Sequence, residues 1–313
     1  LWVEQRQQLG SGHALLQVEP AVRDAGRLLV LSGDVPLLRA ATVERLVIAA
    51  ESGWGSMAVA ECAEPDGLGR VVATADGNLD RIVEAADATP LERSLRLTNA
   101  GLYTLPAPEI FPYLKALLPN NAKGELYLTA ALNAAARDGH PLRLAALDDA
   151  SEGLGVNDRV ELAQAHRVLL DRHSRALQTS GVTVYDADSV TIEPQVTIGT
   201  DCVIHPGVAL LGTTTIGKDC SIHQGAWLRN TTVADGATIE AYSVADGARI
   251  GPRCRVGPFA RLRPGTVLEA GARIGNFVEV KNSTLGVGSK ANHLAYVGDA
   301  SVGAGANLGA GMV

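Results

Sequence analysis

The sequence has little aromatic content and few cysteines. Aromatic residues make up 4% of the 313 residues, although hydrophobic residues reach 46%. The core must therefore be filled by aliphatic side chains and closely packed backbone, which is typical of a repeat protein. The four cysteines include no CxxC pair, and no histidines are paired at ligand spacing. A zinc site is therefore not indicated.

Long apolar runs and an excess of basic residues are also missing. No run approaches the roughly 18 residues that cross a bilayer, and the first residues do not form a signal peptide, so we expect a cytoplasmic protein without a membrane partner. Asp and Glu number 34 against 27 Lys and Arg, giving a net charge of −7. Without a basic cluster we expect no nucleic-acid partner. The length suggests two domains, and because residue 1 is Leu rather than Met we expect a piece of a longer protein.

The first half of the chain mixes short apolar runs with helical patterns, as in α/β folds. The run 27–31 predicts a buried strand that opens into a loop at 32–34 and is followed by a helix. Because parallel α/β sheets bind ligands at the carboxyl ends of strands, Asp34 lies where chemistry is expected. It would bind a divalent metal or merely cap the helix. Glycine-rich stretches at 8–14 and 67–70 would let backbone approach a nucleotide or would form ordinary turns.

A helical pattern of apolar residues runs from Arg159 to Ser180. Asn157 or Asp158 would cap its start, and Gly181 would end it. We expect a connecting helix about 33 Å long, at about 1.5 Å per residue.

Beyond this helix, aliphatic residues recur every six positions, a period that neither a helix nor an alternating strand produces. Two one-residue slips interrupt the series, and glycine often follows the aliphatic residue. The pattern predicts a parallel β-helix in which three hexads form one triangular coil. The predicted inward positions are Ile192, Ile198, Ile204, Leu210, Ile216, Ile222, Leu228, Val233, Ile239, Val244, Ile250, Val256, Leu262, Leu268, Ile274, Val280, Leu285, Val297, Val302 and Leu308.

Three of the cysteines fit this repeat. Cys202, Cys220 and Cys254 each precede a repeat aliphatic by two residues, and Ala237 fills the same position in another coil. They are expected to form one inward column. A disulfide between Cys202 and Cys220 is geometrically possible between stacked coils, but packing of small residues explains the column better.

Outward polar residues of the repeat suggest a site. Arg263 and Lys281 each follow a repeat aliphatic and lie 18 residues apart, so two cations would stack on adjacent coils. Their repulsion, about 3 kcal/mol at an effective dielectric constant near 20, would be relieved by a bound anion or by splaying into solvent. His293 lies one coil beyond Lys281, where Ala291 replaces the repeat aliphatic. A lone histidine is more often structural, but its near-neutral pKa also suits a general base.

Several segments spread over the whole chain form a specific set of motifs. In the first half they are QLGSGHA (8–14), LSGDVPL (31–37), GLGRV (67–71), IVE (82–84), TNAG (98–101) and GVNDR (155–159). In the second half they are GPFARLRPG (257–265), GNFVEVK (275–281) and GSKANHLAYVGD (288–299). Together they resemble the bacterial family of bifunctional N-acetylglucosamine-1-phosphate uridylyltransferases and glucosamine-1-phosphate N-acetyltransferases.

The resemblance implies a fold and two activities. It implies a Rossmann-like α/β nucleotidyltransferase domain over 1–157, a linker helix over 158–181 and a left-handed parallel β-helix acetyltransferase domain over 182–313. The enzyme would acetylate glucosamine-1-phosphate with acetyl-CoA and transfer uridylyl from UTP to the product, releasing pyrophosphate. UDP-N-acetylglucosamine then feeds peptidoglycan and lipopolysaccharide precursors, and with them cell-wall biogenesis and cell shape. The resemblance also implies Mg²⁺ as cofactor and a cytoplasmic homotrimer formed through the β-helices, with acetyl-transfer sites between subunits.

The resemblance also assigns roles to matching residues. In the first domain, the implied uracil contacts are Gln5, Gly10 and Ser11, and the implied residues beside the nucleotide sugar are Ser32 and Gly33. The implied Mg²⁺ ligands are Asp34 and Asn157. The implied N-acetylglucosamine contacts are Gly69, Glu84 and Asn99. In the second domain, the implied phosphate ligands are Arg263 and Lys281, the further substrate contacts are Tyr296 and Asn307, the general base is His293, and the acetyl-CoA contact is Ala310.

The chain departs from the family pattern in a few places. The family's N-terminal glycine-rich loop would lie ahead of Leu1, and further coils that bind acetyl-CoA would follow Val313. We therefore expect this piece alone to bind UTP poorly and to turn over little or nothing. Ser32 stands where Tyr is common in the family, and Met312 where Thr is common.

Two other functions remain as alternatives. One is a sugar-nucleotide pyrophosphorylase with a purely structural β-helix, which would not require Lys281, His293 and Tyr296. The other is a non-catalytic nucleotidyltransferase-like scaffold subunit, which would not need to retain Asp34.

Overall fold

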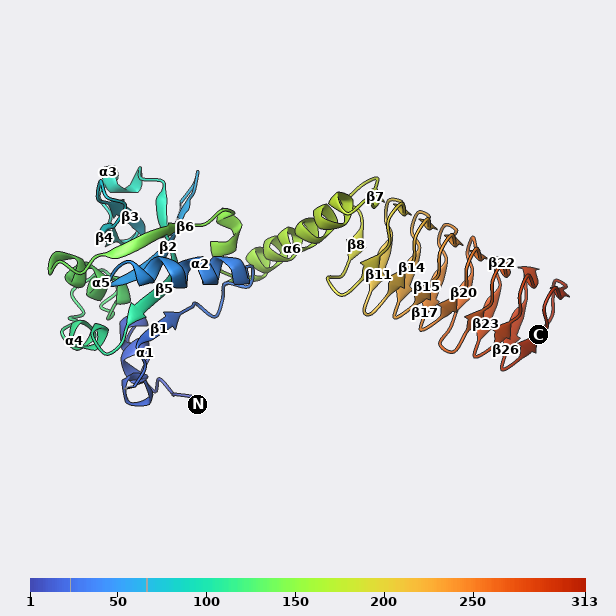
Figure 1. Ribbon diagram of the computed structural model, residues 1–313, viewed down its shortest axis with the longest axis horizontal. Coiled ribbons are helices and arrows are strands. Elements are labelled where there is room, and N and C mark those ends of the chain that lie inside the picture. Colours follow the sequence, from blue (N-terminus) through green and yellow to red (C-terminus); the bar gives the residue numbers. More distant parts are fainter. Residues whose placement is uncertain (23, 66) are drawn as a thin grey trace. The chain divides into compact units, whose positions relative to one another are not determined.

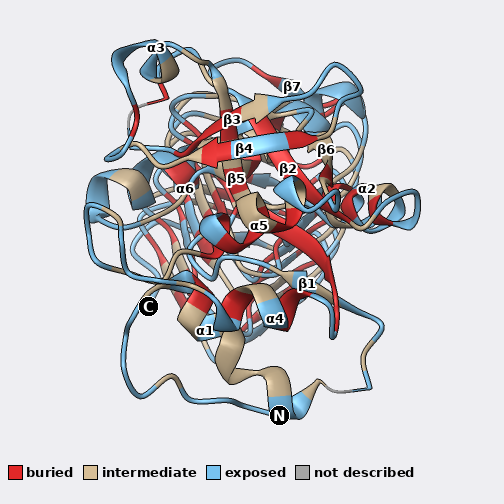
Figure 2. Cartoon of the chain, turned by 90° about the vertical axis from the view of Figure 1, so that its left-hand side faces the viewer, coloured by how far each residue is buried: buried red, intermediate tan, exposed pale blue. Residues whose placement is uncertain are grey.

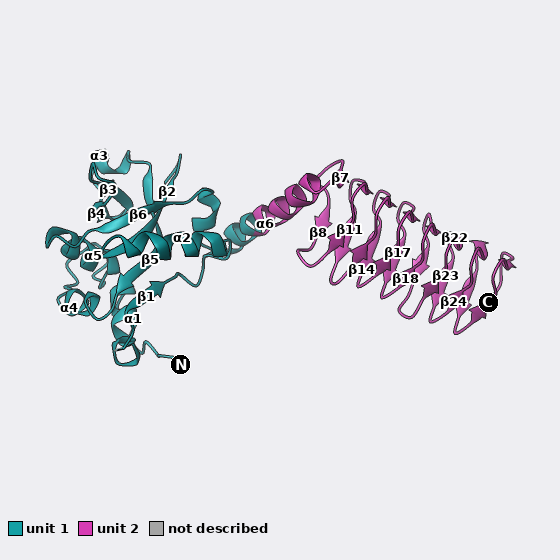
Figure 3. Ribbon diagram, viewed as in Figure 1, with its two compact units in different colours: residues 1–165 teal, residues 166–313 magenta. Residues whose placement is uncertain are grey.

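The computed structural model describes residues 1–22, 24–65 and 67–313. The chain divides into two compact units, Leu1–Ala165 and His166–Val313 (Figure 3). Each unit has hydrophobic clusters of its own. In the described part of the chain, no helix combines the length and the apolar character needed to cross a membrane.

Unit 1 is built around a mixed six-stranded sheet with the order β4-β3-β5-β2-β6 and with β1 also on β5. The strands are β1 (Arg27–Val30), β2 (Gly55–Glu61), β3 (Arg70–Ala73), β4 (Leu79–Val83), β5 (Leu97–Pro106) and β6 (Leu142–Ala146). β2 runs parallel to β6 and antiparallel to β5. Figure 2 shows that the central strands β2 and β5 are largely buried.

The helices of unit 1 are short. They are α1 (Ser11–Gln17), α2 (Ala40–Glu51), α3 (Pro90–Arg93), α4 (Ile110–Lys115) and α5 (Leu128–Arg137), with 3-10 turns at Glu19–Ala21 and Ala150–Gly153. α5 buries Leu128, Ala131, Leu132 and Ala135, a stripe at helical spacing. Asn133 fixes α5 to β4, because its side-chain amide both donates to and accepts from the backbone of Ile82, each at 2.7 Å.

The strand expected at 27–31 forms, but the prediction that it is buried is wrong. β1 alternates between exposed and half-buried residues, and Leu29 and Leu31 are 43% and 44% exposed. Among the described residues β1 pairs with β5 alone, and the pairing is antiparallel. A continuous apolar run does not distinguish a central parallel strand from a strand at an edge.

The helix expected from Arg159 forms as α6 (Arg159–Thr179). Its start is a capping box. Asp158 Oδ1 accepts from the backbone N–H of Val160 and Glu161 at 2.8 and 2.9 Å. In return, Glu161 Oε2 accepts from the N–H of Asp158 at 3.3 Å, and also from that of Asn157 at 2.6 Å. Gly181, with φ 99°, follows the end of the helix, where a residue without a Cβ is favoured.

Unit 2 is a parallel β-helix with three faces, whose coils stack along its length (Figure 1). The first face comprises β7 (Thr183–Val184), β10 (Val203–Ile204), β13 (Ser221–Ile222), β16 (Thr238–Ile239), β19 (Arg255–Val256), β22 (Arg273–Asn276), β25 (Lys290–His293) and β28 (Asn307–Leu308). The second comprises β8 (Thr191–Ile192), β11 (Ala209–Leu211), β14 (Trp227–Arg229), β17 (Val244–Asp246), β20 (Arg261–Leu262), β23 (Glu279–Lys281) and β26 (Tyr296–Gly298). The third comprises β9 (Thr197–Ile198), β12 (Thr215–Ile216), β15 (Thr232–Val233), β18 (Arg249–Ile250), β21 (Val267–Leu268), β24 (Thr284–Leu285) and β27 (Ser301–Val302). The predicted arrangement, an α/β unit followed by a parallel β-helix of hexapeptide repeats, is confirmed.

The interior of the β-helix holds the predicted column of repeat aliphatics, with one correction. Val244 was expected inside, but it is 37% exposed, whereas Ala245 is 2% exposed and faces the core. The strand register pairs Leu228 with Ala245 and Ala245 with Leu262. The inward positions therefore run from Ile239 to Ala245, six residues on, and then to Ile250, five residues on. The repeat is shortened by one residue after Ala245, not before it as predicted.

The predicted cysteine column is confirmed. Cys202, Cys220, Cys254 and Ala237 are each at most 1% exposed, and all three thiols are free. Cys202 Sγ donates to the carbonyl of Gly217 at 2.9 Å. These cysteines act as small core residues with weak donor groups.

Two histidines stack on the first face of the β-helix. The ring centroids of His205 and His223 lie 4.6 Å apart at an interplanar angle of 11°, and the Tyr185 ring lies 5.2 Å from that of His205. Burial and the neighbouring His223 lower the pKa of His205 below its ordinary value of 6.5. At a pH just below 6.5 the unfolded chain therefore binds a proton that the folded protein does not.

We expect this pair to make the protein less stable in mild acid. The contribution of His205 is fully present above pH 6.5 and is lost as the pH falls toward its lowered folded-state pKa. Thermal unfolding at pH 7.5 and pH 5.5 measures it: the difference in Tm should shrink in His205→Asn but not in His166→Asn, which changes an exposed histidine of α6. An equal difference in both variants would remove His205 as its source.

Candidate functional site

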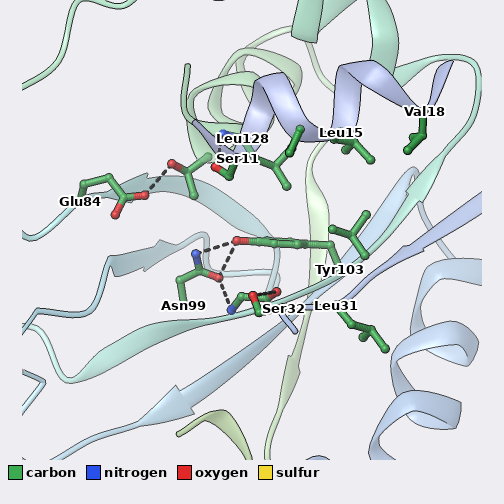
Figure 4. Close-up of a pocket in the computed structure, with 13 residues that line it drawn as sticks. Ser11, Leu15, Val18, Leu31, Ser32, Glu84, Asn99, Tyr103 and Leu128 are labelled. Atoms are coloured by element: carbon green, nitrogen blue, oxygen red, sulfur yellow. Dashed lines mark hydrogen bonds between the residues drawn. The ribbon is translucent and has the colours of Figure 1, made fainter. Parts of the chain in front are cut away.

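A cavity of about 460 Å³ opens in unit 1 beside α1, β5 and the start of α5 (Figure 4). Ser11, Ser32, Glu84 and Asn99, all predicted site residues, line it. The other lining residues are Ala14, Leu15, Val18, Val30, Leu31, Gly101, Tyr103, Leu128 and Thr129. In Figure 4 the polar groups of Glu84 and Asn99 lie at one end, and the apolar Leu15, Val18 and Leu31 lie at the other.

A hydrogen-bond network orders the floor of this cavity. Asn99 Nδ2 donates to Tyr103 Oη at 2.7 Å, and the Tyr103 hydroxyl donates to Asn99 Oδ1 at 3.0 Å. The backbone N–H of Gly101 donates to the same Asn99 oxygen, and Ser32 Oγ donates to the Gly101 carbonyl. Burial raises the pKa of Tyr103, so its hydroxyl stays neutral. Tyr103 was missed from the sequence, although it lies four residues after Asn99 on the same strand.

Glu84, Asn99 and Gly69 form a second group. Thr129 Oγ1 donates to Glu84 Oε1 at 2.6 Å, and the Asn99 N–H donates to the Gly69 carbonyl at 2.9 Å. A Cβ on Gly69 would lie 3.4 Å from Glu84 Oε2 and 3.7 Å from the Asn99 Cβ. The absence of a side chain at Gly69 therefore keeps the space between the carboxylate and the amide open.

The glycine-rich stretch at 8–14 packs against another part of the chain. Gly10 has φ 112°, and a Cβ there would lie 2.7 Å from the Leu126 carbonyl. Gly12 N donates to that carbonyl at 2.8 Å, and Ser11 Oγ accepts from Leu128 N at 3.0 Å. Backbone packing at the border of the cavity thus accounts for these glycines.

Asp34 and Asn157 come from distant parts of the chain and meet at Gly155. A Cβ on Gly155 would lie 3.6 Å from Asp34 Oδ2 and 3.8 Å from Asn157 Nδ2. Val156 N donates to the Asp34 carbonyl at 2.9 Å, which ties the two segments together. The oxygen and nitrogen of an Asn amide occupy interchangeable positions, so an Asn157 oxygen can face the same space.

This pair fits Mg²⁺ as an open site. Mg²⁺ usually takes one or two protein oxygens and completes its shell with water and substrate phosphates. Both Asp34 and Asn157 are exposed. In the three described ranges no three His, Cys, Asp or Glu side chains cluster as a metal site, so the other ligands would have to come from substrate and water.

Six of the ten predicted site residues of unit 1 lie outside the lining of the cavity: Gln5, Gly10, Gly33, Asp34, Gly69 and Asn157. Gln5 Nε2 donates to the Gly10 carbonyl at 3.2 Å and lies 3.0 Å from His13 Nδ1. Gly33 is exposed and lies between Ser32 and Asp34.

On the β-helix, Arg263 and Lys281 occupy neighbouring coils as expected. The register pairs Leu262 with Val280, the residues that precede them. Arg263 Nη1 lies 3.0 Å from Glu279 Oε1, and Lys281 Nζ lies 3.2 Å from Asp299 Oδ2. From the sequence, the two cations were expected either to share a bound anion or to point apart into solvent. The structure shows neither arrangement, because each cation pairs with a carboxylate of the same chain. Both basic side chains remain 40% exposed, and exposed ion pairs of this kind are worth only about 0–1 kcal/mol, so an incoming phosphate can replace the partners.

Asp299 is a charged residue that the sequence reasoning missed. Asn282 Nδ2 donates to its Oδ1 at 2.8 Å, and the hydrogen bonds from Asn282 and Lys281 lower its pKa. Asp299 lies one coil after Asn282. This spacing in the repeat could have identified Asp299 from the sequence as a neighbour of Asn282 and Lys281. It holds the Lys281 ammonium group.

The remaining predicted residues divide between two edges of the second face. Lys281 ends β23 at the corner before the third face, whereas His293 ends β25 at the corner before the second face. Tyr296 begins β26, and its ring lies 2.6–2.8 Å from the Cβ position of Gly298, which is paired with Lys281. Tyr296 thus extends toward the cations, while His293 lies at the opposite edge.

Asn307 and Ala310 belong to the next coil. The register pairs Lys290 with Asn307 and Ala291 with Leu308, and its continuation sets Ala310 beside His293. Asn307 is exposed at the far edge of the first face. In a single chain the acetyl-transfer residues therefore do not form one cluster.

An exposed apolar ladder runs along the corner that carries His293. The corner ladder comprises Tyr242, Phe259, Phe277 and Leu294, which are 50%, 48%, 59% and 63% exposed. The three rings stack, with centroids 5.4 and 5.6 Å apart. All four residues have φ between 42° and 56°, a conformation that bulky side chains rarely adopt.

An α/β unit with this cavity, followed by a hexapeptide β-helix, is the two-domain arrangement that the sequence motifs predicted. Comparisons with known proteins agree. The family model for the GMPPB C-terminal domain matches residues 186–285. The bifunctional protein GlmU of Alkalilimnicola ehrlichii is 43% identical over all of this chain and 67% of its own length, and that of Chromobacterium violaceum is 42% identical over all of this chain and 69% of its own. The chain belongs to the bifunctional GlmU family.

Together with the parallel β-helix, membership of this family confirms the predicted fold class, a nucleotidyltransferase-like α/β unit followed by a left-handed β-helix. Two further proteins resemble this chain. GlmU of Methylococcus capsulatus is 43% identical over all of this chain and 68% of its own length. The crystal structure of UDP-glucose pyrophosphorylase complexed with UDP-glucose aligns at 19% identity and a TM-score of 0.43, over 55% of this chain and 66% of its own. Membership of the GlmU family confirms the prediction of a UDP-N-acetylglucosamine-synthesising enzyme with uridylyltransferase and acetyltransferase activities. The chain spans about two thirds of the length of these relatives.

Proposed function

We propose that the cavity of unit 1 is the site of uridylyl transfer from UTP to N-acetylglucosamine-1-phosphate. The observation that carries this proposal is the convergence of Ser11, Ser32, Glu84 and Asn99, from four separate segments, on one cavity. The Glu84 carboxylate accepts hydrogen bonds and the Asn99 amide both donates and accepts them, as recognition of sugar hydroxyl and acetamido groups requires. The apolar wall at Leu15 would exclude water from the opposite end.

Asp34 and Asn157 would hold Mg²⁺ beside this cavity. When bound, the ion stabilises negative charge on the leaving pyrophosphate and orients the triphosphate. The contribution of the chain is positioning, because the link between Val156 and Asp34 holds the two ligand side chains on one side of the loop.

Replacing Asp34 with asparagine tests this assignment in the product of the complete reading frame. The Mg²⁺ concentration for half-maximal pyrophosphate release should rise at least about 10-fold, because a charged oxygen ligand is lost. Asp76→Asn, which changes an exposed carboxylate of unit 1, serves as the matched control, and acetyl transfer should stay unchanged in both. An unaltered Mg²⁺ requirement in Asp34→Asn would refute the assignment, whereas loss of both activities would indicate misfolding.

We further propose that the β-helix performs acetyl transfer. Arg263 and Lys281 bind the phosphate of glucosamine-1-phosphate, and Tyr296 lies beside them. His293 takes the proton from the amine as the amine nitrogen attacks the carbonyl carbon of the acetyl-CoA thioester, and the C–S bond breaks to release coenzyme A. Asn307 is a further substrate contact, and the position of Ala310 one coil beyond His293 supports its role as the acetyl-CoA contact.

This assignment requires a second copy of the chain, and we propose a homotrimer formed through the β-helices. In one chain His293 and Lys281 lie at opposite edges of the second face, so a neighbouring subunit must bring a base and a phosphate site together. The corner ladder supports this proposal, because an exposed contiguous apolar patch next to His293 is typical of an interaction surface. Sedimentation equilibrium should give three times the chain mass, and a monomer mass would refute the trimer.

We also propose a cytoplasmic location, with small-molecule substrates as the partners and with the product feeding cell-wall precursors. The free thiols of the β-helix support a reducing compartment.

A further inference from the structure

A second cavity in unit 1 has no part in the proposed reactions. Its volume is about 710 Å³, within the range of ligand sites. Its lining comes from the turn before β2, from α4 and from the end of α5, and comprises Trp54, Glu109, Pro112, Tyr113, Ala116, Ala134, Asp138 and His140.

Three aromatic rings gather in this second cavity. The Trp54 ring meets that of Tyr113 edge to face, with centroids 6.0 Å apart and an angle of 87°. It stacks with the His140 ring at 5.9 Å and 24°. Arg27 fixes the turn that carries Trp54, because its guanidinium donates to the carbonyls of Gly53 and Trp54 at 3.3 and 3.2 Å. Indole and phenol rings present a negative electrostatic face.

The charges that line the second cavity are negative. Glu109 and Asp138 contribute carboxylates, and no Lys or Arg is among the described residues that line it. Burial and the neighbouring Asp138 carboxylate raise the pKa of Tyr113. The carboxyl end of α5, which ends at Arg137, adds the negative end of a helix dipole. An anionic nucleotide would be repelled here, whereas a cation would be attracted.

We propose that the second cavity binds a small organic cation, an ammonium group that carries apolar substituents. The apolar surface of Trp54 and Pro112 accommodates the substituents, and the ring faces together with Glu109 and Asp138 stabilise the charge. A hydrated metal ion does not suit this lining, because hard cations require several oxygen ligands and no cluster of three metal-binding side chains occurs in the described residues.

Choline and its uncharged isostere 3,3-dimethylbutan-1-ol test the proposal, because they share a shape and differ in charge. Trp54 fluorescence reports binding in a Trp2→Phe, Trp227→Phe background, where it is the only indole, and sodium chloride keeps the ionic strength constant. Choline should bind saturably and about 10-fold more tightly than the isostere, a ratio within the range of cation–π recognition. Equal affinity for both compounds would show that the cavity recognises only apolar surface, which would refute a cation site. Binding of neither compound would also overturn the proposal.

The carboxylates provide the second arm of the test. Asp138→Asn should weaken choline binding about 3- to 10-fold and leave isostere binding unchanged, whereas Glu51→Gln, which changes an exposed carboxylate on α2, should affect neither. If Asp138→Asn does not fold, Glu109→Gln replaces it, because the Glu109 side chain makes no capping bond to α4. Choline affinity that is the same in the parent and in the folded carboxylate variant would refute the proposed role of charge.

Discussion

Replacing His293 with alanine is expected to lower kcat/KM for acetyl transfer by about 10²- to 10⁴-fold, the usual contribution of a general base. The attacking amine must lose a proton as the amide bond forms, and His293 is the titratable group that the proposal places beside the acetyl-CoA contact Ala310. The measurement is acetylation of glucosamine-1-phosphate by the product of the complete reading frame, followed over a range of pH. The loss should be found at every pH of this range.

The control for this variant is His166→Ala, which removes an exposed histidine of α6 and should leave both activities unchanged. Uridylyl transfer should also survive in His293→Ala, because the cavity of unit 1 uses none of its atoms. If acetylation persists at the parental rate, His293 is not the base.

Replacing Val233 with aspartate should destabilise the β-helix by about 3–5 kcal/mol or more, the usual cost of a buried charge without a partner. Val233 is 2% exposed in β15 and faces the aliphatic column. Its neighbour Thr232 lies on the same strand and is exposed, so Thr232→Asp is a matched control that introduces the same charge on the outer surface. Urea unfolding followed by circular dichroism measures both variants.

The loss should also be local along the β-helix. Each coil contacts mainly its neighbours, so hydrogen exchange should accelerate first in β12, β15 and β18, while the sheet of unit 1 keeps its protection. Equal stability of the two aspartate variants would mean that Val233 does not face a closed core.

The β-helix could be predicted closely from the sequence because its physical code is simple. One inward aliphatic per hexad fixes both the face and the register of every strand. The prediction failed at Val244, because alanine is small enough to fill an inward position without appearing in an aliphatic pattern, and the valine beside it was chosen instead. The prediction that the strand over 27–31 is buried was also wrong. An apolar residue such as Leu29 does not reveal whether its strand is covered on one side or on both.

The candidate sites were less accessible to sequence reasoning. Asp34 and Asn157 are far apart in the chain, and only the fold brings them together at Gly155. The family motifs supplied their roles, whereas spacing alone left Asp34 as metal ligand or helix cap. Tyr103 and Asp299 were missed because their importance lies in hydrogen bonds to Asn99 and Lys281, which composition and periodicity do not reveal.

The ion pairs of the β-helix also bear on how a sugar phosphate would be captured. Glu279 and Asp299 already pair with Arg263 and Lys281 in the absence of substrate. Because these exposed pairs are worth only about 0–1 kcal/mol each, they bias the two side chains toward the site and cost little to break. If Arg263 and Lys281 bind the phosphate as proposed, capture would exchange one anion for another, and the released carboxylates would be solvated by water.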